Sequence, residues 1–587
     1  MRKSKLLIPL SFLGLLLLFS CKQDPTHLFL IGPYVQNVRS DGITISWEDE
    51  VISEGMVHYG KTKELGHTLS DARNSNLHEL MLTGLDPETV YFYQVESAGK
   101  KSEVFHFRTA VNENSPFSFA VYGDNKNGPF NHEKLARLIS ENEPDFVLHN
   151  GDLVERGGVH KQWVKLFFTP AREMISHIPL FTIIGNHEDN DENYYNYFSP
   201  PTDNKAWYSF DYGNAHFVIL QSDEEFMMED STQVKWLKKD LAANQHQTWR
   251  FVLLHKPPFS SGGQHYVKTR IKMKELIVPI FNEYRVDMVL SGDDHNYERT
   301  VPIGSKNAAM PITYVVCGNG GTPMRYVIPS SWTRVAKRVF GFTKIALDGT
   351  SMHYRHLTLE GEVLDEFTLD KTDPASLASY KEGMLVYETM QDVDPEVASA
   401  AREGRSLLRD GLYAEAIREF EYALARDSNC LIAKAQMAQC YVGLGDFDKA
   451  RVLAMETYER IPQFPDSYEA MIEIHTQLEN WEEALLWCDR LESISADSPD
   501  AARSRTEIYM DMGDLPSAIE KLKKGIEIVP NDYELHRELA ELYGAVGDTT
   551  LMLQSLKQGV EWYMNPEEDA EYLAALRLIT ELEKRKI

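Results

Sequence analysis

The sequence predicts a multidomain protein in which an all-β sandwich, a layered α/β domain of the αββα type and an all-α solenoid follow one another along 587 residues. Three observations lead to this division. Apolar and polar residues alternate over 28–110, as in half-buried strands. Within 116–370, short apolar runs end in Asp, Asn or His and alternate with helical segments. From 397 onward, equivalent residues recur every 34 positions.

The composition fits several folded domains and argues against nucleic acid as a partner. Apolar residues make up 43% of the chain, which is enough for sizeable cores. The 89 acidic residues outnumber the 60 Lys and Arg residues, giving a formal net charge of −29. Because binding to a phosphate backbone requires clustered basic residues, we expect no nucleic-acid partner.

The first 21 residues have the organisation of an export signal. A basic start precedes the apolar run Leu6–Phe19, which is too short to span a bilayer comfortably. Leu18-Phe19-Ser20-Cys21 resembles a bacterial lipobox. This resemblance implies a signal peptide at 1–20, acylation of Cys21, and an exported lipoprotein anchored by lipid at a bacterial membrane, in the periplasm or at the cell surface. An ordinary secretory signal with a chance cysteine is the alternative.

Residues 28–110 are expected to form the β-sandwich. Ile43, Ile45 and Trp47 alternate with polar residues, and a second alternating run contains Tyr91 and Tyr93. The stretch that ends at Tyr93 is similar to the late strand of fibronectin type III sandwiches, where a Tyr ties down a corner. We expect this domain to contribute packing and no chemistry.

Five apolar runs of the α/β domain end in side chains that can bind a metal. The run Leu180–Ile184 is followed by Gly185, which allows a sharp turn, and then by Asn186 and His187. The other four runs end at Asp124, Asp152, His255, and Asp293 with His295. Ligand sites in layered α/β folds lie at the carboxyl ends of strands, so these residues should meet. Such a set of oxygen and nitrogen ligands suits metals of intermediate hardness.

The motifs at these strand ends resemble those of the calcineurin-like metallophosphoesterases. The likeness covers about 116–370 and is carried by Gly123-Asp124, Gly151-Asp152, Gly185-Asn186-His187-Glu188, His255 and Gly292-Asp293-Asp294-His295. The continuation to Tyr297-Glu298-Arg299 is similar to the His-x-Tyr-Glu-Arg motif of the purple acid phosphatase branch. Members of that branch carry a front domain like the one predicted at 28–110.

The resemblance implies two divalent or trivalent metal ions. One would be held by Asp124, Asp152 and His295, and the other by Asp152, Asn186, His255 and Asp293, with Asp152 bridging. It further implies hydrolysis of a phosphate monoester by a metal-bound hydroxide, with His187 donating a proton to the leaving alkoxide. The same metal pair can cleave phosphodiesters, and the sequence leaves this alternative open.

Three positions depart from the family pattern. Glu155 replaces the Tyr of purple acid phosphatases, so the metal–phenolate colour should be absent, and its carboxylate or a water could complete the first metal site. Lys126 stands where the wider family often has His. Asp293 replaces a His, which should favour Mn, Fe or Mg over Zn. The alternative is that Asp293 belongs to an exposed acidic turn and that the second metal site is defective.

Three further residues are candidates for substrate contact. His265 follows the ligand His255 in a glycine-containing loop, and a plain loop role is the equal alternative. Lys256 and Arg299 could reach the phosphate, although pairing with nearby carboxylates is the favoured role.

The C-terminal region has the period of tetratricopeptide (TPR) repeats. Residues that recur 34 apart are Gly411, Gly445, Glu479, Gly513 and Gly547, and likewise Ala416, Ala450, Ala484 and Ala518. We expect a linker at 371–396, five repeats over 397–566 and a capping helix at 567–587. A solenoid of this kind predicts a protein or peptide partner.

Two functions from different classes therefore compete. The first is a dinuclear phosphatase that is exported and lipid-anchored, with an interaction tail. The second is a scaffold in which the solenoid binds a partner and the phosphatase domain is degenerate. The five ligand motifs favour the enzyme, whereas Lys126 and Asp293 favour the scaffold.

Overall fold

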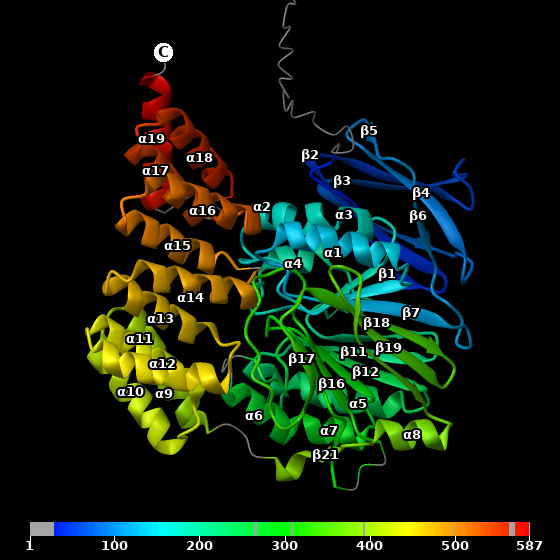
Figure 1. Cartoon of the computed structure of the whole chain (residues 1–587). Coiled ribbons are helices and arrows are strands. Elements are labelled where there is room, and N and C mark those ends of the chain that lie inside the picture. The colour runs from blue at the N-terminus through cyan, green and yellow to red at the C-terminus, as the bar shows by residue number, and fades with distance from the viewer. Residues whose placement is uncertain are drawn as a thin grey trace, which may run out of the picture.

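The computed structural model describes residues 29–202, 204–262, 267–306, 308, 310–390, 394–496, 498–562 and 570–585. The predicted signal peptide, Cys21 and His265 therefore lie outside the described residues. The predicted fold class is confirmed: an N-terminal sheet domain is followed by an α/β sandwich and a C-terminal run of helices (Figure 1). Within the described ranges, no helix is both long and apolar enough to cross a membrane.

The N-terminal domain consists of antiparallel strands around a buried aromatic cluster. Its strands are β1 (Ile31–Arg39), β2 (Gly42–Gly60), β3 (His67–Thr83), β4 (Val90–Ser97), β5 (Lys100–Lys101) and β6 (Phe105–Arg108). Trp47 is fully buried, stacks on His78 and donates its indole N–H to Ser97 at 2.8 Å. The hydroxyl of Tyr91 accepts a hydrogen bond from the backbone N–H of Asp86 at 3.0 Å and so fixes the corner before β4.

This domain shares a sheet with the domain that follows. β1 runs parallel to β9 (Leu180–Thr182), with Gln36 opposite Leu180, and the join creates one 12-stranded sheet. Alternation in the sequence shows which face of a strand is buried, but it does not show which strand lies alongside. The join was therefore not predicted, and the likeness to fibronectin type III stays a prediction.

Two sheets face each other in the central domain. The first contains β20 (Val363–Asp370), β19 (Ser351–Thr358), β18 (Gly341–Asp348), β7 (Phe117–Tyr122), β8 (Phe146–His149) and β9 in this order. The second contains β10 (Tyr208–Tyr212), β11 (Ala215–Leu220), β12 (Trp249–Leu254), β13 (Met288–Ser291), β16 (Thr313–Cys317), β14 (Tyr297–Thr300) and β17 (Thr333–Lys337). In each sheet, the strands nearest the predicted ligands are parallel.

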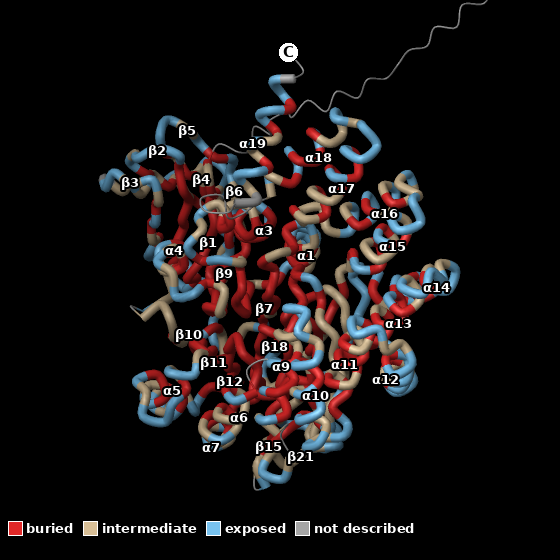
Figure 2. Tube along the Cα trace, turned by 90° about the vertical axis from the view of Figure 1, so that its left-hand side faces the viewer, coloured by how far each residue is buried: buried red, intermediate tan, exposed pale blue. Residues whose placement is uncertain are grey.

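Aromatic side chains fill the space between the two sheets. Phe119 of the first sheet meets Phe251 of the second edge-on at 5.2 Å, and Phe146 meets Phe217 at 5.3 Å. Helices α1 (Pro129–Glu141) and α3 (Thr169–Ile175) cover the outer face of the first sheet, and α5 (Thr232–Ala243), α6 (Val267–Leu276) and α7 (Val278–Glu283) cover the second. Buried residues concentrate in these central strands (Figure 2). This packing fixes the strand ends relative to one another.

The C-terminal helices follow the period of 34 residues. They are α9 (Pro395–Arg409), α10 (Tyr413–Arg426), α11 (Leu431–Gly443), α12 (Phe447–Arg460), α13 (Pro465–Gln477), α14 (Trp481–Ile494), α15 (Asp500–Asp511), α16 (Leu515–Ile528), α17 (Tyr533–Ala545), α18 (Thr549–Trp562) and α19 (Ala570–Arg585). The recurring Ala416, Ala450, Ala484 and Ala518 are fully buried. Glu479, at a position that is glycine in the other repeats, keeps the same left-handed backbone with φ 55°.

The segment 371–396, predicted as a linker, carries structure of its own. It contains α8 (Pro374–Tyr380) and the short strand β21 (Leu385–Val386), which pairs with β15 (Ile303–Gly304). The hydroxyl of Tyr380 lies 2.8 Å from the Thr313 hydroxyl. The start of the solenoid is therefore tied to the central domain.

Candidate metal centre

The predicted ligands come together where strands of both sheets end. Asp124, Asp152 and Asn186 follow β7, β8 and β9 of the first sheet, and His255 and Asp293 follow β12 and β13 of the second. All of these strands point their carboxyl ends toward the same region, because they are parallel within each sheet. The centre therefore lies between the two sheets, as ligand sites do in layered α/β folds.

Three aspartates of the centre have an unusual backbone. Asp124, Asp152 and Asp293 adopt φ angles of 59°, 56° and 65°. An L-residue in this left-handed region costs on the order of 1 kcal/mol, and such residues cluster at functional sites. Each turn lets the chain leave its strand sharply while the carboxylate stays directed toward the centre.

Glycines next to the ligands allow the strand ends to approach closely. A Cβ atom at Gly185 would lie 2.3 Å from Oδ1 of Asp152, and one at Gly292 would lie 2.4 Å from Oδ2 of Asp124. Neither contact is sterically acceptable, so these positions require glycine as long as the aspartates keep their places.

His255 lies at the middle of the ligand cluster. Its Nε2 atom is 3.3 Å from Oδ1 of Asp152, 3.2 Å from Oδ1 of Asn186 and 3.8 Å from Oδ1 of Asp293. Asp124, Asp152 and His255 each offer a ligand atom, and these atoms lie within 4.8 Å of one another. All three residues are buried.

Backbone carbonyls fix both ligand histidines in the tautomer that metal binding requires. Nδ1 of His255 donates to the carbonyl of Asn150 at 2.7 Å, and Nδ1 of His295 donates to the carbonyl of Pro323 at 3.0 Å. Each Nε2 atom is thereby directed at the cluster, where a metal ion would take the place of its proton. Nε2 of His295 lies 3.7 Å from Oδ1 of Asp124, and both atoms are buried without a hydrogen-bond partner among the described residues.

The electrostatics of the cluster call for a cation. Burial raises the pKa of the Asp124 carboxyl to about 8. Burial alone would lower the pKa of His255, but the carboxylates of Asp152 and Asp124 raise it to about 10. The buried, unpartnered acceptor atoms and the mixed carboxylate, amide and imidazole donors therefore fit metal ions.

Lys126 reaches into the centre and competes with a cation. Its ammonium is buried and donates to Oδ2 of Asp152. Burial opposes its charge, but Asp152 and Asp124 raise the Lys126 pKa. The same ammonium adds to burial and Arg325 in holding the pKa of His295 well below its usual range. The replacement at Lys126 thus places positive charge beside the carboxylate predicted to bridge two metals.

His187 stands at the accessible edge of the centre. Its side chain is 27% exposed, whereas Asp152 is buried. Nδ1 of His187 donates to the backbone carbonyl of Glu155 at 2.9 Å and lies 3.5 Å from Oε1 of the same residue. Its Nε2 atom lies 3.9 Å from Oδ2 of Asp152. An imidazole in this position can exchange a proton both with solvent and with a ligand at the centre.

Glu188, to which no role was assigned from its sequence motif, lies beneath the ligands. The buried Glu188 carboxylate accepts hydrogen bonds from the backbone N–H groups of Gly185, Asp152 and Leu153 at 2.6, 3.0 and 2.7 Å. It therefore joins the turn after β9 to the turn after β8. Burial, followed by the charge of Asp152, raises its pKa to about 7. Its position next to His187 in the sequence could not reveal these backbone contacts.

The predicted substrate contacts are engaged in other interactions. Lys256 donates to Asp223 at 2.6 Å. The Arg299 guanidinium forms a bidentate ion pair with the Asp365 carboxylate, with hydrogen bonds of 2.6 and 2.7 Å, and lies over the ring of Phe367. A role of Lys256 or Arg299 in phosphate binding stays a prediction, as does that of His265.

Family models match each part of the chain. The calcineurin-like phosphoesterase model matches residues 117–297, and the model of the purple acid phosphatase N-terminal domain matches 32–109. Two tetratricopeptide repeat models match 407–457 and 507–547. The predicted front domain of the purple acid phosphatase type, the phosphoesterase domain and the tetratricopeptide repeats are thereby confirmed.

Individual relatives carry the same likeness. Acid phosphatase type 7 of Danio rerio is 27% identical over 421 residues, which cover 59% of this chain and 91% of the relative. Purple acid phosphatase 15 of Arabidopsis thaliana is 30% identical over 354 residues, covering 52% and 66%. A purple acid phosphatase from yellow lupin (Lupinus luteus) seeds, PPD1, has a similar fold, with a TM-score of 0.51, 20% identity and coverage of 62% and 77%.

Replacing Glu188 should loosen the centre without removing a ligand. In Glu188→Gln, an amide group must face backbone N–H donors, so we expect a loss of about 2–3 kcal/mol in the free energy of unfolding. Affinity for Mn²⁺ should fall about 10–100-fold. Thermal unfolding and calorimetric titration measure the two effects. Glu192→Gln, at the exposed start of α4 (Glu192–Tyr197), is the matched control, and equal behaviour of the two variants would contradict the role of Glu188.

Removing the Lys126 charge should strengthen metal binding. In Lys126→Gln, the ammonium no longer repels a cation at Asp152, and we expect Mn²⁺ to bind about tenfold more tightly. Calorimetric titration at pH 7 gives affinity and stoichiometry, with the exposed Lys134→Gln on α1 as the control. Weaker binding in Lys126→Gln would instead mean that the ammonium orients Asp152 for the metal.

Proposed function

We propose that the protein hydrolyses phosphate monoesters with a dinuclear metal centre. It joins a purple acid phosphatase N-terminal domain to a calcineurin-like phosphoesterase domain, and purple acid phosphatases are among its homologues. The domain match and the homologues support a hydrolase. The convergence of Asp124, Asp152 and His255 on one point carries the proposal. The identity of the ions stays open among Fe, Mn, Zn and Mg.

Each metal position would draw on residues of both sheets. Asp152 would serve both positions, with its Oδ1 atom on the side of His255 and its Oδ2 atom on the side where Lys126 now lies. Asn186 and Asp293 flank His255, and Asp124 faces His295. Metal ions bound here would supply an activated water and neutralise charge on the phosphoryl oxygens.

The remaining chemistry belongs to the chain itself. His187 projects from the rim of the centre, and its Nδ1–H is held by the Glu155 carbonyl. In its cationic form, the Nε2 proton of His187 is available to the oxygen of the departing alcohol. Asp124, Asp152 and His255 are buried, whereas the His187 side chain is 27% exposed, so solvent can approach the reacting groups from the side of His187.

We further propose that the protein is exported and held at a membrane by lipid on Cys21. The basic start, the short apolar run Leu6–Phe19 and the cysteine that follows support this proposal. Metabolic labelling with a fatty acid, in the wild type and in Cys21→Ser, tests it.

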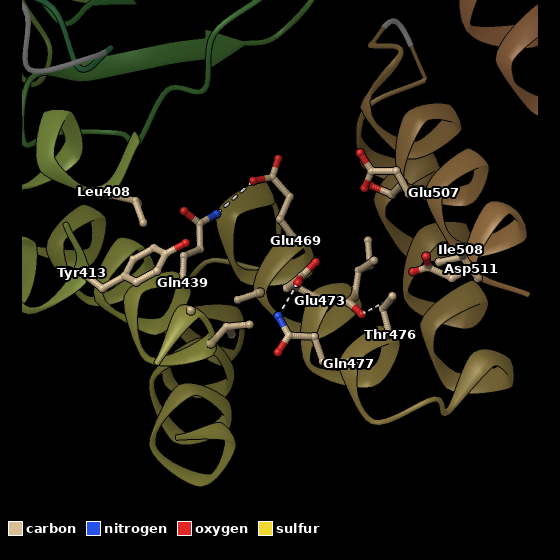
Figure 3. Close-up of a pocket in the computed structure, with 15 residues that line it drawn as sticks. Leu408, Tyr413, Gln439, Glu469, Glu473, Thr476, Gln477, Glu507, Ile508 and Asp511 are labelled. Atoms are coloured by element: carbon tan, nitrogen blue, oxygen red, sulfur yellow. Dashed lines mark hydrogen bonds between the residues drawn. The ribbon is translucent and has the colours of Figure 1, made fainter. Parts of the chain in front are cut away.

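The solenoid contains an acidic groove that suits a basic partner. A cavity of about 480 Å³ lies between α11, α13 and α15, and four of the residues that line it are Glu469, Glu473, Glu507 and Asp511 (Figure 3). Burial raises the pKa of Glu469 to about 8 and shifts that of Glu507 upward, and neighbouring carboxylates add to both shifts. A positively charged side chain in the groove would relieve this repulsion, so we propose a peptide rich in Lys or Arg as the partner.

The scaffold alternative keeps one specific observation in its favour. Lys126 contacts Asp152, and an ammonium that fully replaced one metal ion would leave a binding module with little catalysis. Metal content and turnover separate the two functions.

Metal analysis and turnover test the phosphatase directly. Elemental analysis of protein lacking residues 1–21 should find about two ions per chain, and an aryl phosphate monoester should be hydrolysed faster than the diester. Asp152→Asn should lose both metal and activity. A preference for the diester would assign a phosphodiesterase, and the absence of metal and turnover after addition of Mn, Fe, Zn or Mg would leave the scaffold.

His187 should show its role in the dependence on the leaving group. His187→Ala should keep its metal and lose about 10²–10⁴-fold in kcat for an alkyl phosphate, because an alkoxide needs the proton. The loss should be much smaller for a nitrophenyl phosphate, whose leaving group is stable without it. His353→Ala, a partly exposed histidine of β19 paired with Glu366, is the control. Equal losses with both esters would contradict proton donation.

Neutralising the groove should weaken binding of a basic peptide. Glu469→Gln combined with Glu507→Gln removes two of the four carboxyl groups that a basic side chain in the groove would meet, and we expect fluorescence anisotropy with an Arg-rich peptide to show about tenfold weaker binding. Wild-type binding should weaken with added salt. Glu421→Gln, at an exposed position of α10, should change nothing. Tighter binding of an acidic peptide would overturn this assignment.

A further inference from the structure

The edge of the solenoid contacts the central domain through equivalent turns of two successive repeats. Ser495 and Val529, 34 residues apart, each follow the second helix of a repeat. The hydroxyl of Ser495 lies 2.6 Å from that of Tyr326, and Asn531 donates to the carbonyl of Asn127 at 2.9 Å. Figures 1 and 2 both show α14 to α17 running beside the central domain.

The end of α18 makes the most varied of these contacts. The ring of Trp562 meets Phe130 edge-on at 5.5 Å, and the ammonium of Lys165 lies 5.0 Å from the Trp562 ring centre. Lys161 and Lys165 both donate to the carbonyl of Glu561 at 3.2 Å. Two lysines thus cover carbonyl oxygen at the negative end of the helix, where cations are favoured.

The segments that receive these contacts also carry the metal centre. Asn127 follows Lys126, whose ammonium contacts Asp152. Tyr326 lies three residues after Pro323, whose carbonyl holds the ligand His295. The solenoid is therefore attached to the rim of the centre and not to a remote surface.

A cavity of about 300 Å³ lies in this interface. The central domain lines it with Asn127, Glu155, Gln162, Leu166 and Pro323, and the solenoid lines it with Val529, Asn531, Asp532, Tyr533 and Trp562. Its size is at the lower end of the range for pockets that hold small organic molecules. About half of its lining comes from repeats that purple acid phosphatase models do not include.

Glu155 connects this cavity to the proton donor. Its Oε1 atom lies 3.5 Å from Nδ1 of His187, whereas its Oε2 atom is buried and has no hydrogen-bond partner among the described residues. A buried carboxylate oxygen without a partner is costly unless a ligand donates to it. Glu155 thus lies between His187 and the cavity, so the alcohol part of an ester whose phosphate is bound at the centre can extend past His187 into the cavity.

We propose that the solenoid completes the substrate pocket, and that the cavity between Glu155 and Trp562 receives the alcohol part of the phosphate ester. This inference rests on the proposed phosphatase function. The rings of Tyr533 and Trp562 provide walls against which a flat ring can stack, and the Glu155 oxygen accepts a hydrogen bond from a hydroxyl group. Glu155 and Asp532 disfavour an anionic alcohol. The chemistry therefore selects an uncharged alcohol that combines a flat ring with hydroxyl groups, as a nucleoside does.

Two esters that differ only in the alcohol test the pocket. In the full-length metal-loaded protein, Trp562→Ala and Tyr533→Ala should lower kcat/KM for adenosine 5′-monophosphate about tenfold, the usual effect of losing a stacking ring. Values for ethyl phosphate, whose alcohol has no ring that could stack, should change less than about twofold. Tyr422→Ala, an exposed ring on α10 far from the interface, is the matched control. Equal losses for both esters, or none, would overturn the proposal.

A binding measurement separates this inference from the phosphatase function. Calorimetric titration with adenosine alone needs no turnover. If the wild type hydrolyses no ester but binds adenosine, and Trp562→Ala abolishes the binding, the pocket stands and the phosphatase function fails. If the wild type hydrolyses ethyl phosphate but neither binds adenosine nor prefers its monophosphate, the phosphatase stands and the pocket assignment fails.

Discussion

Repulsion among buried carboxylates is the constraint on which the rest of the structure depends. Asp124, Asp152 and Asp293 are held close together by left-handed turns at the ends of strands from two sheets. Such an arrangement is unfavourable without positive charge, because burial penalises each carboxylate and each carboxylate penalises the others. His255 and Lys126 supply part of that charge, and the unpartnered atoms of Asp124 and His295 mark where a cation would supply more.

The strand ends could be predicted from the sequence because their signals are local. An apolar run followed by glycine and an Asp or His specifies both a buried strand and the residue at its end, and the structure brings these residues together. Glu188 and Lys126 show where this reasoning stops. The backbone donors that Glu188 satisfies and the carboxylate that Lys126 contacts lie on other segments, so no local pattern identifies the pairing. The sheet join at Gln36 and Leu180 escaped prediction for the same reason.

The repeats show the same division between local and long-range information. A period of 34 residues predicted the solenoid, and Glu479 keeps the left-handed turn of the glycines it replaces. The docking of the solenoid was not predictable, because Ser495, Asn531 and Trp562 are ordinary residues at inter-repeat turns until Tyr326, Asn127 and Phe130 are placed opposite them. An interaction tail that docks on the rim of a metal centre can contribute residues to the site, whereas a tail joined only by a linker cannot.

The cost of this arrangement is the strongest argument for the enzyme over the scaffold. A scaffold would gain nothing from three aspartates in left-handed conformations or from two histidines whose Nδ1 protons are held by backbone carbonyls. The left-handed conformations lower stability unless a ligand offsets their cost, and stability is marginal in most proteins. The solenoid adds to this argument, because its turns are fixed to the loops of Asn127 and Pro323 that hold the centre. Binding of a partner along the acidic groove would therefore act on the same rigid frame that positions His187 and Asp152.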